Sequence, residues 1–300
     1  MVEYPVRPES VRRRYRELAD DVRDRERRIR GDLPVETTAG IHAHLRGVVT
    51  DWETGRKSLR TVPVCNAVAR QVGRSPGDDL TAVLTALDAS VNVLDDVIDT
   101  RELSPRTRVA LTANAAFSAA FLAENCPPDS RAAVGSRLRE YFTALFQIPL
   151  VERELFAEMT DASEADSRTR AAERIYAYRA RDIDAFVRIA TLLSDVDADC
   201  GRRLLGDLRA YRARRLLFKD IADVERDLAD GDVTPVVHLL DRHDSAEAVA
   251  DSVEELYGRF PYSDAGAERY GDVLAELEDP PTDLRSAVRE AGDHLAAADI

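Results

Sequence analysis

Three aspartates close an otherwise apolar stretch of this chain. Asp95, Asp96 and Asp99 follow residues 80–94, a run rich in Leu, Val and Ala that contains neither Gly nor Pro. This composition predicts a mostly buried helix, on which Asp95 and Asp99 share one face and Asp96 lies about 100° round. Carboxylates this close together raise one another's pKa unless a cation neutralises them. The motif therefore predicts a site for a hard divalent ion, Mg²⁺ first.

A second acidic cluster follows the apolar residues 216–218. Asp220, Asp223 and Asp227 stand at i, i+3 and i+7, which is one stripe of a helix. With 34 aspartates in 300 residues, either cluster alone is a weak signal and is more often a solvated face. Two stripes on two helices, however, can face each other across a bundle and hold Mg²⁺ together with a diphosphate. The predicted metal ligands are Asp95, Asp99, Asp220, Asp223 and Asp227.

Two cations lie near the start of another predicted helix, which opens near Gly55 and runs to Val72. Lys57 and Arg60 are three residues apart, so together with free backbone N–H groups they predict an anion site on a first turn. The chain contains 42 basic residues, of which Lys57 and Lys219 are the two lysines. Because the chain has so few lysines, the presence of one in each predicted site favours a functional role for both.

Composition predicts an all-α protein. Glycine and proline are few, strand-like alternation is scarce, and 44% apolar residues are enough for a core. We expect a single large helical domain over 1–300, with an N-terminal helix within 1–34 and C-terminal helices within 236–300. The expected helices cover residues 10–30, 37–50, 55–72, 80–99, 245–260, 266–277 and 282–298.

The charge balance argues against a nucleic-acid-binding protein. The net charge is −14, and such a surface repels a phosphate backbone. An acidic, lysine-poor composition is typical of a protein from a high-salt cytoplasm, which we take as a hypothesis. The first thirty residues lack an apolar signal segment, and we expect no transmembrane segment and a cytoplasmic location. Three scattered cysteines indicate core thiols rather than a disulfide framework or a zinc site.

At this point the chain resembles the trans-isoprenyl diphosphate (polyprenyl) synthases. Residues 55–60 resemble the G-G-K-x-L-R-P segment, residues 95–99 the first aspartate-rich motif, and residues 181–186 the K-T-G-x-L-F segment. Residues 218–223 resemble the end of F-Q-x-x-D-D-x-x-D, and residues 227–235 resemble a shortened D-L-x-x-G-K-x-T-x-P stretch. The order and spacing of these segments agree with the family over most of residues 40–240.

The resemblance implies the class I isoprenoid synthase fold, a helical bundle with a central cavity, and a homodimer. It also implies condensation of an allylic prenyl diphosphate with isopentenyl diphosphate, with Mg²⁺ as the cofactor. The catalytic residues would be Asp95, Asp96, Asp99, Asp220, Asp223 and Arg181, and the substrate-binding residues Lys57, Arg60, Arg106 and Lys219. The small side chains of Ser90 and Val91, one turn before the first motif, would favour a product longer than C15.

Several departures from the family pattern leave alternatives open. Asp88 stands where the family usually has an acceptor-site His, and Lys219 replaces the first Asp of the second motif. Arg106 is a few residues late for the family's Arg pair. A class I terpene cyclase or a head-to-head prenyl synthase is therefore a second interpretation, for which Arg269-Tyr270 would be a late diphosphate contact. A catalytically silent partner subunit is the third.

Overall fold

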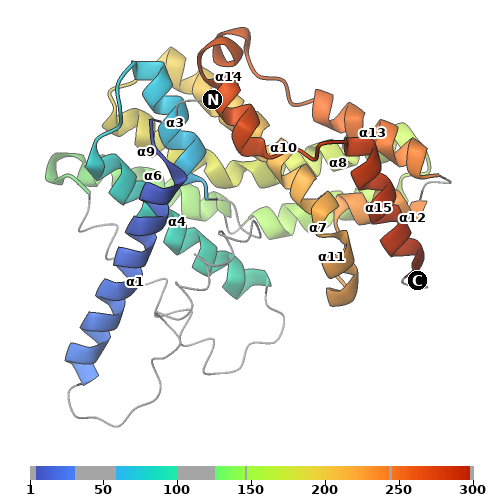
Figure 1. Cartoon of the computed structure of the whole chain (residues 1–300), viewed down its shortest axis with the longest axis horizontal. Coiled ribbons are helices and arrows are strands. Elements are labelled where there is room, and N and C mark those ends of the chain that lie inside the picture. Colours follow the sequence, from blue (N-terminus) through green and yellow to red (C-terminus); the bar gives the residue numbers. More distant parts are fainter. Residues whose placement is uncertain (1–4, 31–58, 100–125, 146, 243–244, 298–300) are drawn as a thin grey trace. The chain divides into compact units, whose positions relative to one another are not determined.

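The computed structural model describes residues 5–30, 59–99, 126–145, 147–242 and 245–297 (Figure 1). Every regular element in these ranges is a helix, so the all-α prediction is confirmed for the described part of the chain. The elements are α1 (Pro8–Arg30), α3 (Thr61–Val72), α4 (Asp78–Asp99), η2 (Pro128–Ser130), α6 (Arg131–Leu145), α7 (Ile148–Asp161), α8 (Ala165–Arg179), η3 (Ala180–Ile183), α9 (Asp184–Leu193), α10 (Ala198–Ala222), α11 (Val224–Asp230), α12 (Pro235–Arg242), α13 (Ala246–Gly258), α14 (Asp264–Glu278) and α15 (Leu284–Ala297).

The chain divides into two compact units. One comprises Leu138–Val187 and Asp197–Ile300, and the other Glu3–Arg137 and Arg188–Val196. We call them the α10 unit and the α4 unit after the helices that carry the acidic motifs. The expectation of a single domain with a central cavity stays a prediction.

In the α4 unit, helix α1 packs against α3 and α4. Tyr15 of α1 is fully buried, and its hydroxyl accepts a hydrogen bond from Asn92 of α4 at 3.2 Å. Asn66 of α3 fixes the segment before α1 through two hydrogen bonds. Its side-chain oxygen accepts from the Val6 N–H at 2.9 Å, and its side-chain nitrogen donates to the Val6 carbonyl at 2.8 Å. These contacts hold the helix that carries the first acidic motif.

In the α10 unit, helix α10 contacts α8, α12, α14 and α15. It begins at an N-cap, because the Asp197 side chain accepts hydrogen bonds from the N–H groups of Asp199 and Cys200. Its apolar face, including Leu216 and Leu217, joins a core with α8, α12, α13 and α15. Because this face is buried, the rotation of α10 about its axis is fixed, and so are the side chains that it directs toward α8.

Several helix boundaries differ from those expected. Helix α3 begins at Thr61 rather than near Gly55, so Arg60 is its N-cap residue and does not lie on a first turn. Helix α10 ends at Ala222, and Asp223 (φ −97°, ψ 1°) links it to the short helix α11. The second acidic stripe is therefore bent at Asp223. The expected C-terminal helices match α13, α14 and α15 closely, whereas α12 was not anticipated.

Other expectations meet the structure only in part. Cys65 and Cys126 are buried and Cys200 is half-buried, and none of the three forms a disulfide. The helix expected over 37–50 lies outside the described residues. Among the helices that the structure describes, none combines the length and the hydropathy needed to cross a bilayer.

Candidate functional site

The first acidic motif lies in the last turns of α4. The helix predicted over Asp95, Asp96 and Asp99 is present, since α4 extends to Asp99. The side chains of these three aspartates are outside the described part of the structure, as are Lys57 and Arg106 entirely. The roles assigned to these five residues stay predictions.

The second acidic motif is described in full and lies where α10 passes into α11. Asp220 is 3% exposed, and its Oδ2 accepts two hydrogen bonds from α8. The Tyr176 hydroxyl donates at 2.9 Å and the Arg179 guanidinium at 2.8 Å. No group in the described residues donates to Oδ1 of Asp220. The two donors on Oδ2 thus fix the orientation of the carboxylate.

Arg179 is held from a second side as well. Its Nε lies 3.6 Å from Glu152 of α7. Burial opposes the positive charge of Arg179, yet Asp220 and Glu152 together raise its pKa. Burial also raises the pKa of Glu152. A half-buried arginine with two carboxylate partners remains charged and is restricted in position.

Asp223 and Asp227 share one arginine. The Arg226 guanidinium donates to Oδ2 of Asp223 at 2.6 Å and to Oδ1 of Asp227 at 3.4 Å. Burial raises the pKa of Asp227 to about 6, and the nearby carboxylates of Asp220 and Asp223 add to the rise. In both Asp223 and Asp227 the second carboxylate oxygen has no donor among the described groups. The bent stripe therefore still presents one open oxygen from each of three aspartates.

Lys219 lies beside this stripe and is half-buried. It forms no ion pair with any side chain in the described residues. Burial lowers its pKa, while the carboxylates of Asp220 and Asp223 oppose that change. Lys219 is therefore only partly exposed to solvent beside the acidic stripe, and its place in a metal and diphosphate site stays a prediction.

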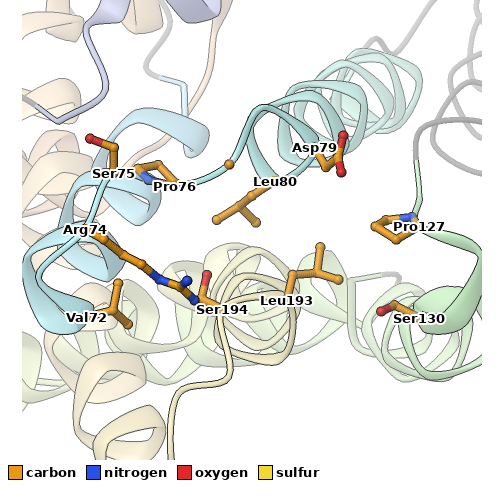
Figure 2. A pocket seen from close by; sticks show the side chains of 11 residues that line it. Val72, Arg74, Ser75, Pro76, Asp79, Leu80, Pro127, Ser130, Leu193 and Ser194 are labelled. Atoms are coloured by element: carbon orange, nitrogen blue, oxygen red, sulfur yellow. The ribbon is translucent and has the colours of Figure 1, made fainter.

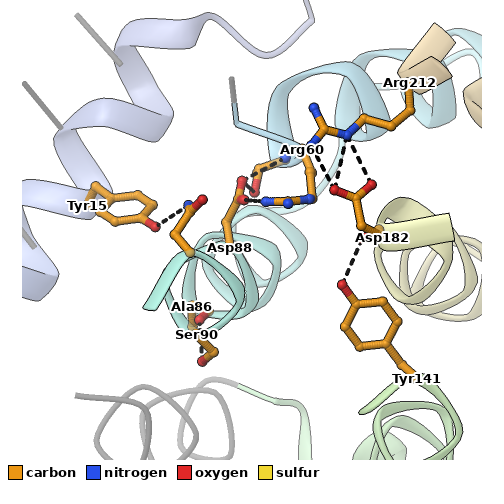
Figure 3. A network of polar contacts seen from close by, with 10 residues as sticks. Tyr15, Arg60, Ala86, Asp88, Ser90, Tyr141, Asp182 and Arg212 are labelled. Atoms are coloured by element: carbon orange, nitrogen blue, oxygen red, sulfur yellow. Dashed lines mark hydrogen bonds and ion pairs between the residues drawn. The ribbon is translucent and has the colours of Figure 1, made fainter. Parts of the chain in front are cut away.

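Arg181 lies in η3 and is exposed. Its guanidinium stacks 5.3 Å from the centre of the Tyr178 ring and lies 3.9 Å from Asp184. The flanking aspartates anchor the segment to α10. Asp182 accepts from Arg212 at 2.7 Å (Figure 3). Asp184 accepts from Arg209, also at 2.7 Å. The segment is fixed while the Arg181 guanidinium remains accessible to an anion.

Arg60 lies against a buried carboxylate of the α4 unit. Its side chain is 4% exposed and lies 3.4 Å from Oδ1 of Asp88 (Figure 3). Oδ2 of Asp88 accepts hydrogen bonds from the N–H and the hydroxyl of Thr61, both at 3.0 Å. Burial raises the pKa of Asp88. In this arrangement Arg60 compensates a buried carboxylate within the α4 unit, and its role toward an acceptor diphosphate stays a prediction.

The cyclase interpretation predicts that Arg269-Tyr270 contacts a diphosphate. In the structure the Tyr270 side chain points into the α10 unit and contacts Asp207. Tyr270 is 2% exposed, and its hydroxyl donates to Oδ2 of Asp207 at 2.5 Å. The backbone N–H and the hydroxyl of Ser263 also donate to Asp207, at 2.7 and 2.8 Å. Tyr270 thus serves the packing of α14 on α10, and its hydroxyl is not available to a diphosphate.

A pocket of about 450 Å³ lies in the α4 unit, at the end of α4 away from the acidic motif (Figure 2). The α3–α4 connection, the start of α4 and the end of α9 line it, with Arg74, Asp79, Leu80 and Leu193 among the side chains. None of the predicted site residues belongs to this lining.

The chemistry of the acidic stripe fits Mg²⁺ in a limited way. Carboxylate oxygens are the ligands that Mg²⁺ prefers, and Mg²⁺ commonly takes one or two carboxylates, several waters and substrate phosphate oxygens. Within the described ranges no three His, Cys, Asp or Glu side chains converge as a ready-made metal cage. The open oxygens of Asp220, Asp223 and Asp227 are thus of the chemical type that Mg²⁺ prefers, but within the described ranges they do not form a metal site by themselves.

Sequence reasoning missed the groups that hold Asp220. Tyr176 and Arg179 lie one helical turn apart at the end of α8, just before Arg181. Their spacing places them on one face, but which helix that face meets depends on packing between segments 41 and 44 residues apart. The only sequence signal that could have drawn attention to Tyr176 and Arg179 is the high density of aromatic and basic residues in 174–181.

No family model matches this chain, and no curated protein sequence matches it. Among solved structures, the chain is similar to a geranylgeranyl pyrophosphate synthetase from the archaeon Geoglobus acetivorans. The TM-score is 0.48 and the sequence identity 13%, over 95% of this chain and 98% of that chain.

Proposed function

We propose that the protein is a Mg²⁺-dependent prenyltransferase that condenses an allylic prenyl diphosphate with isopentenyl diphosphate. The observation that carries the proposal is the second acidic motif, in which three aspartates each present an oxygen without a described donor, next to Lys219. The order and spacing of the five family-like segments support the same reaction.

When bound, Mg²⁺ would neutralise charge on the diphosphate as its bond to the allylic carbon breaks. Asp220, Asp223 and Asp227 would hold the metal, and Asp95 and Asp99 are proposed as further ligands, with Asp96 as a further catalytic carboxylate. Arg181 and Lys219 would add positive charge to the leaving diphosphate. Lys57, Arg60 and Arg106 are proposed to bind diphosphate, with Lys57 and Arg60 serving the acceptor. Ser90 and Val91, both buried in α4, are consistent with a product longer than C15.

A second candidate has an observation in its favour. Because Arg60 is buried against Asp88, an acceptor diphosphate would have to compete with that carboxylate for it. A class I enzyme that ionises one prenyl diphosphate without isopentenyl diphosphate needs no acceptor anchor. In such an enzyme the acidic stripe would still hold the metal that binds the diphosphate.

One assay separates these candidates. The protein, in high KCl with Mg²⁺, is given labelled isopentenyl diphosphate and allylic diphosphates of several lengths. Incorporation of label into a longer prenyl diphosphate supports the transferase, and consumption of the allylic diphosphate without acceptor supports the cyclase or head-to-head reaction. No turnover with any substrate, in a folded protein, overturns both and leaves the silent-subunit interpretation.

A further inference from the structure

We infer that Arg179 and Tyr176 are positioning residues that hold Oδ2 of Asp220 and leave Oδ1 as its single metal-binding oxygen. The inference rests on the proposed function, because it assigns Asp220 to a metal. It adds two residues that no family-like segment contains. Both act through Asp220 and neither is assigned to touch the substrate.

The geometry singles out one oxygen of Asp220. The Tyr176 hydroxyl and the Arg179 guanidinium, at 2.9 and 2.8 Å, both donate to Oδ2. Two donors on one carboxylate oxygen fix the rotation of the carboxylate as well as its position. A carboxylate held in this way can offer a metal only its other oxygen.

The two donors are themselves rigidly held. Tyr176 is fully buried in the core of the α10 unit, so its ring cannot change rotamer without opening that core. Arg179 is restrained by Glu152 of α7 in addition to Asp220. Helices α7, α8 and α10 therefore meet at Asp220, and packing of the three determines its orientation.

This arrangement is what a ligand for Mg²⁺ requires. Mg²⁺ demands near-ideal octahedral geometry, so a carboxylate that is free to rotate or to bind through both oxygens is a poorer ligand. Groups that hydrogen-bond a metal-ligating carboxylate orient it, and their removal typically lowers metal affinity about 10-fold to 100-fold. The positive charge of Arg179 alone would have the opposite effect, since it repels a cation.

The test therefore uses variants that keep the charge. Arg179→Lys retains the cation but loses the planar guanidinium, and Tyr176→Phe removes one donor without changing charge or shape. Titration calorimetry measures binding of Mg²⁺ alone to the full chain. We expect each variant to bind Mg²⁺ about 10-fold more weakly than the wild type. The Mg²⁺ concentration for half-maximal turnover should rise, with little change in kcat at saturating Mg²⁺.

The matched control is Tyr270→Phe, which removes the same donor from the other buried aspartate of α10. It should leave Mg²⁺ affinity unchanged although it also breaks a buried Tyr–Asp bond. Equal Mg²⁺ affinity in wild type, Arg179→Lys and Tyr176→Phe overturns the inference, and so does an equal loss in Tyr270→Phe. Wild-type protein that binds no Mg²⁺ overturns it together with the metal assignment. Mg²⁺ binding that depends on Tyr176, without any prenyl turnover, overturns only the proposed function.

Discussion

Asp207 and Asp220 lie on the same helix, and each is 3% exposed, yet their carboxylates are satisfied in different ways. Asp207 uses both oxygens: Oδ1 accepts from the Ser263 N–H, and Oδ2 accepts from the hydroxyls of Ser263 and Tyr270. Asp220 has two donors on Oδ2 and no described donor on Oδ1.

Burial alone therefore does not distinguish Asp207 from Asp220, which we propose as a metal ligand. Asp207 is saturated by neighbours that belong to α14 and its N-cap, so its role is to fix that helix on α10. Asp220 is oriented through Oδ2 alone, which is why we propose its Oδ1 as the metal-binding oxygen. The two aspartates differ in how their donors are distributed over the two carboxylate oxygens.

The largest expected effect comes from exchanging each aspartate for its isosteric amide. Asp220→Asn should lower turnover by about a thousandfold or more, because it removes charge stabilisation of the leaving diphosphate. Asp207→Asn should lower the free energy of unfolding but leave turnover per folded molecule close to wild type. Steady-state kinetics and urea denaturation on both variants measure the two effects. Wild-type turnover in Asp220→Asn would remove Asp220 from the site.

A structural role for Asp207 also predicts a large cost at Gly266. A Cβ at this position would collide with the Asp207 carboxylate, whereas a Cβ on Gly271 of the same helix would make ordinary contacts. Gly266→Ala should lower the free energy of unfolding by about 1–3 kcal/mol, as overpacking typically does. Gly271→Ala is the control and should be close to neutral. Equal stability of the two variants in urea denaturation would contradict the tight Asp207 network.

The acidic stripe should give the protein a characteristic pH dependence. In an unfolded chain Asp titrates near a pKa of about 3.9, and in the folded protein the pKa of Asp227 is raised to about 6. Between these values the folded state binds more protons, so the free energy of unfolding falls as pH rises from about 4 to about 6. Asp227→Asn should remove this part of the fall.

Urea denaturation across that pH range, without divalent cations, measures the effect. Glu225→Gln is the matched control, since it removes an exposed carboxylate from the same short helix and should leave the pH dependence in place. An unchanged pH profile in Asp227→Asn would show that the stripe is more solvated than its burial indicates.

The smallest expected effect concerns Lys219. Its ammonium lies near carboxylates that are assigned to a metal, so it should weaken Mg²⁺ binding by repulsion. Lys219→Asp should therefore tighten the Mg²⁺ dependence several-fold. An unchanged Mg²⁺ titration would place this side chain outside the metal site.

Much of the helical framework could be predicted from periodicity. The apolar run before Asp95 predicted α4, and Pro and Gly breakers predicted α13 to α15 within a few residues. The break at Asp223 was not predicted, because the i, i+3, i+7 spacing of the acidic residues is equally compatible with one continuous helix.

The contacts that give each site residue its character could not be predicted. Arg60 and Asp88 are 28 residues apart, and nothing in their local sequence indicates that they pair. Tyr270 was assigned to a diphosphate from a two-residue pattern, whereas packing of α14 on α10 places it against Asp207. Periodicity identifies which face of a helix is buried, but the partner of a polar group on that face depends on tertiary packing.

The most direct test of the account is the position of the metal itself. Crystals grown with Mn²⁺ and a non-reactive prenyl diphosphate analogue would show the ion by anomalous scattering. We predict an ion about 2.1 Å from Oδ1 of Asp220, with Oδ2 still bonded to Tyr176 and Arg179, and no ion at Asp207. An ion bound through Oδ2, or a bound analogue with no metal at Asp220, would contradict the account.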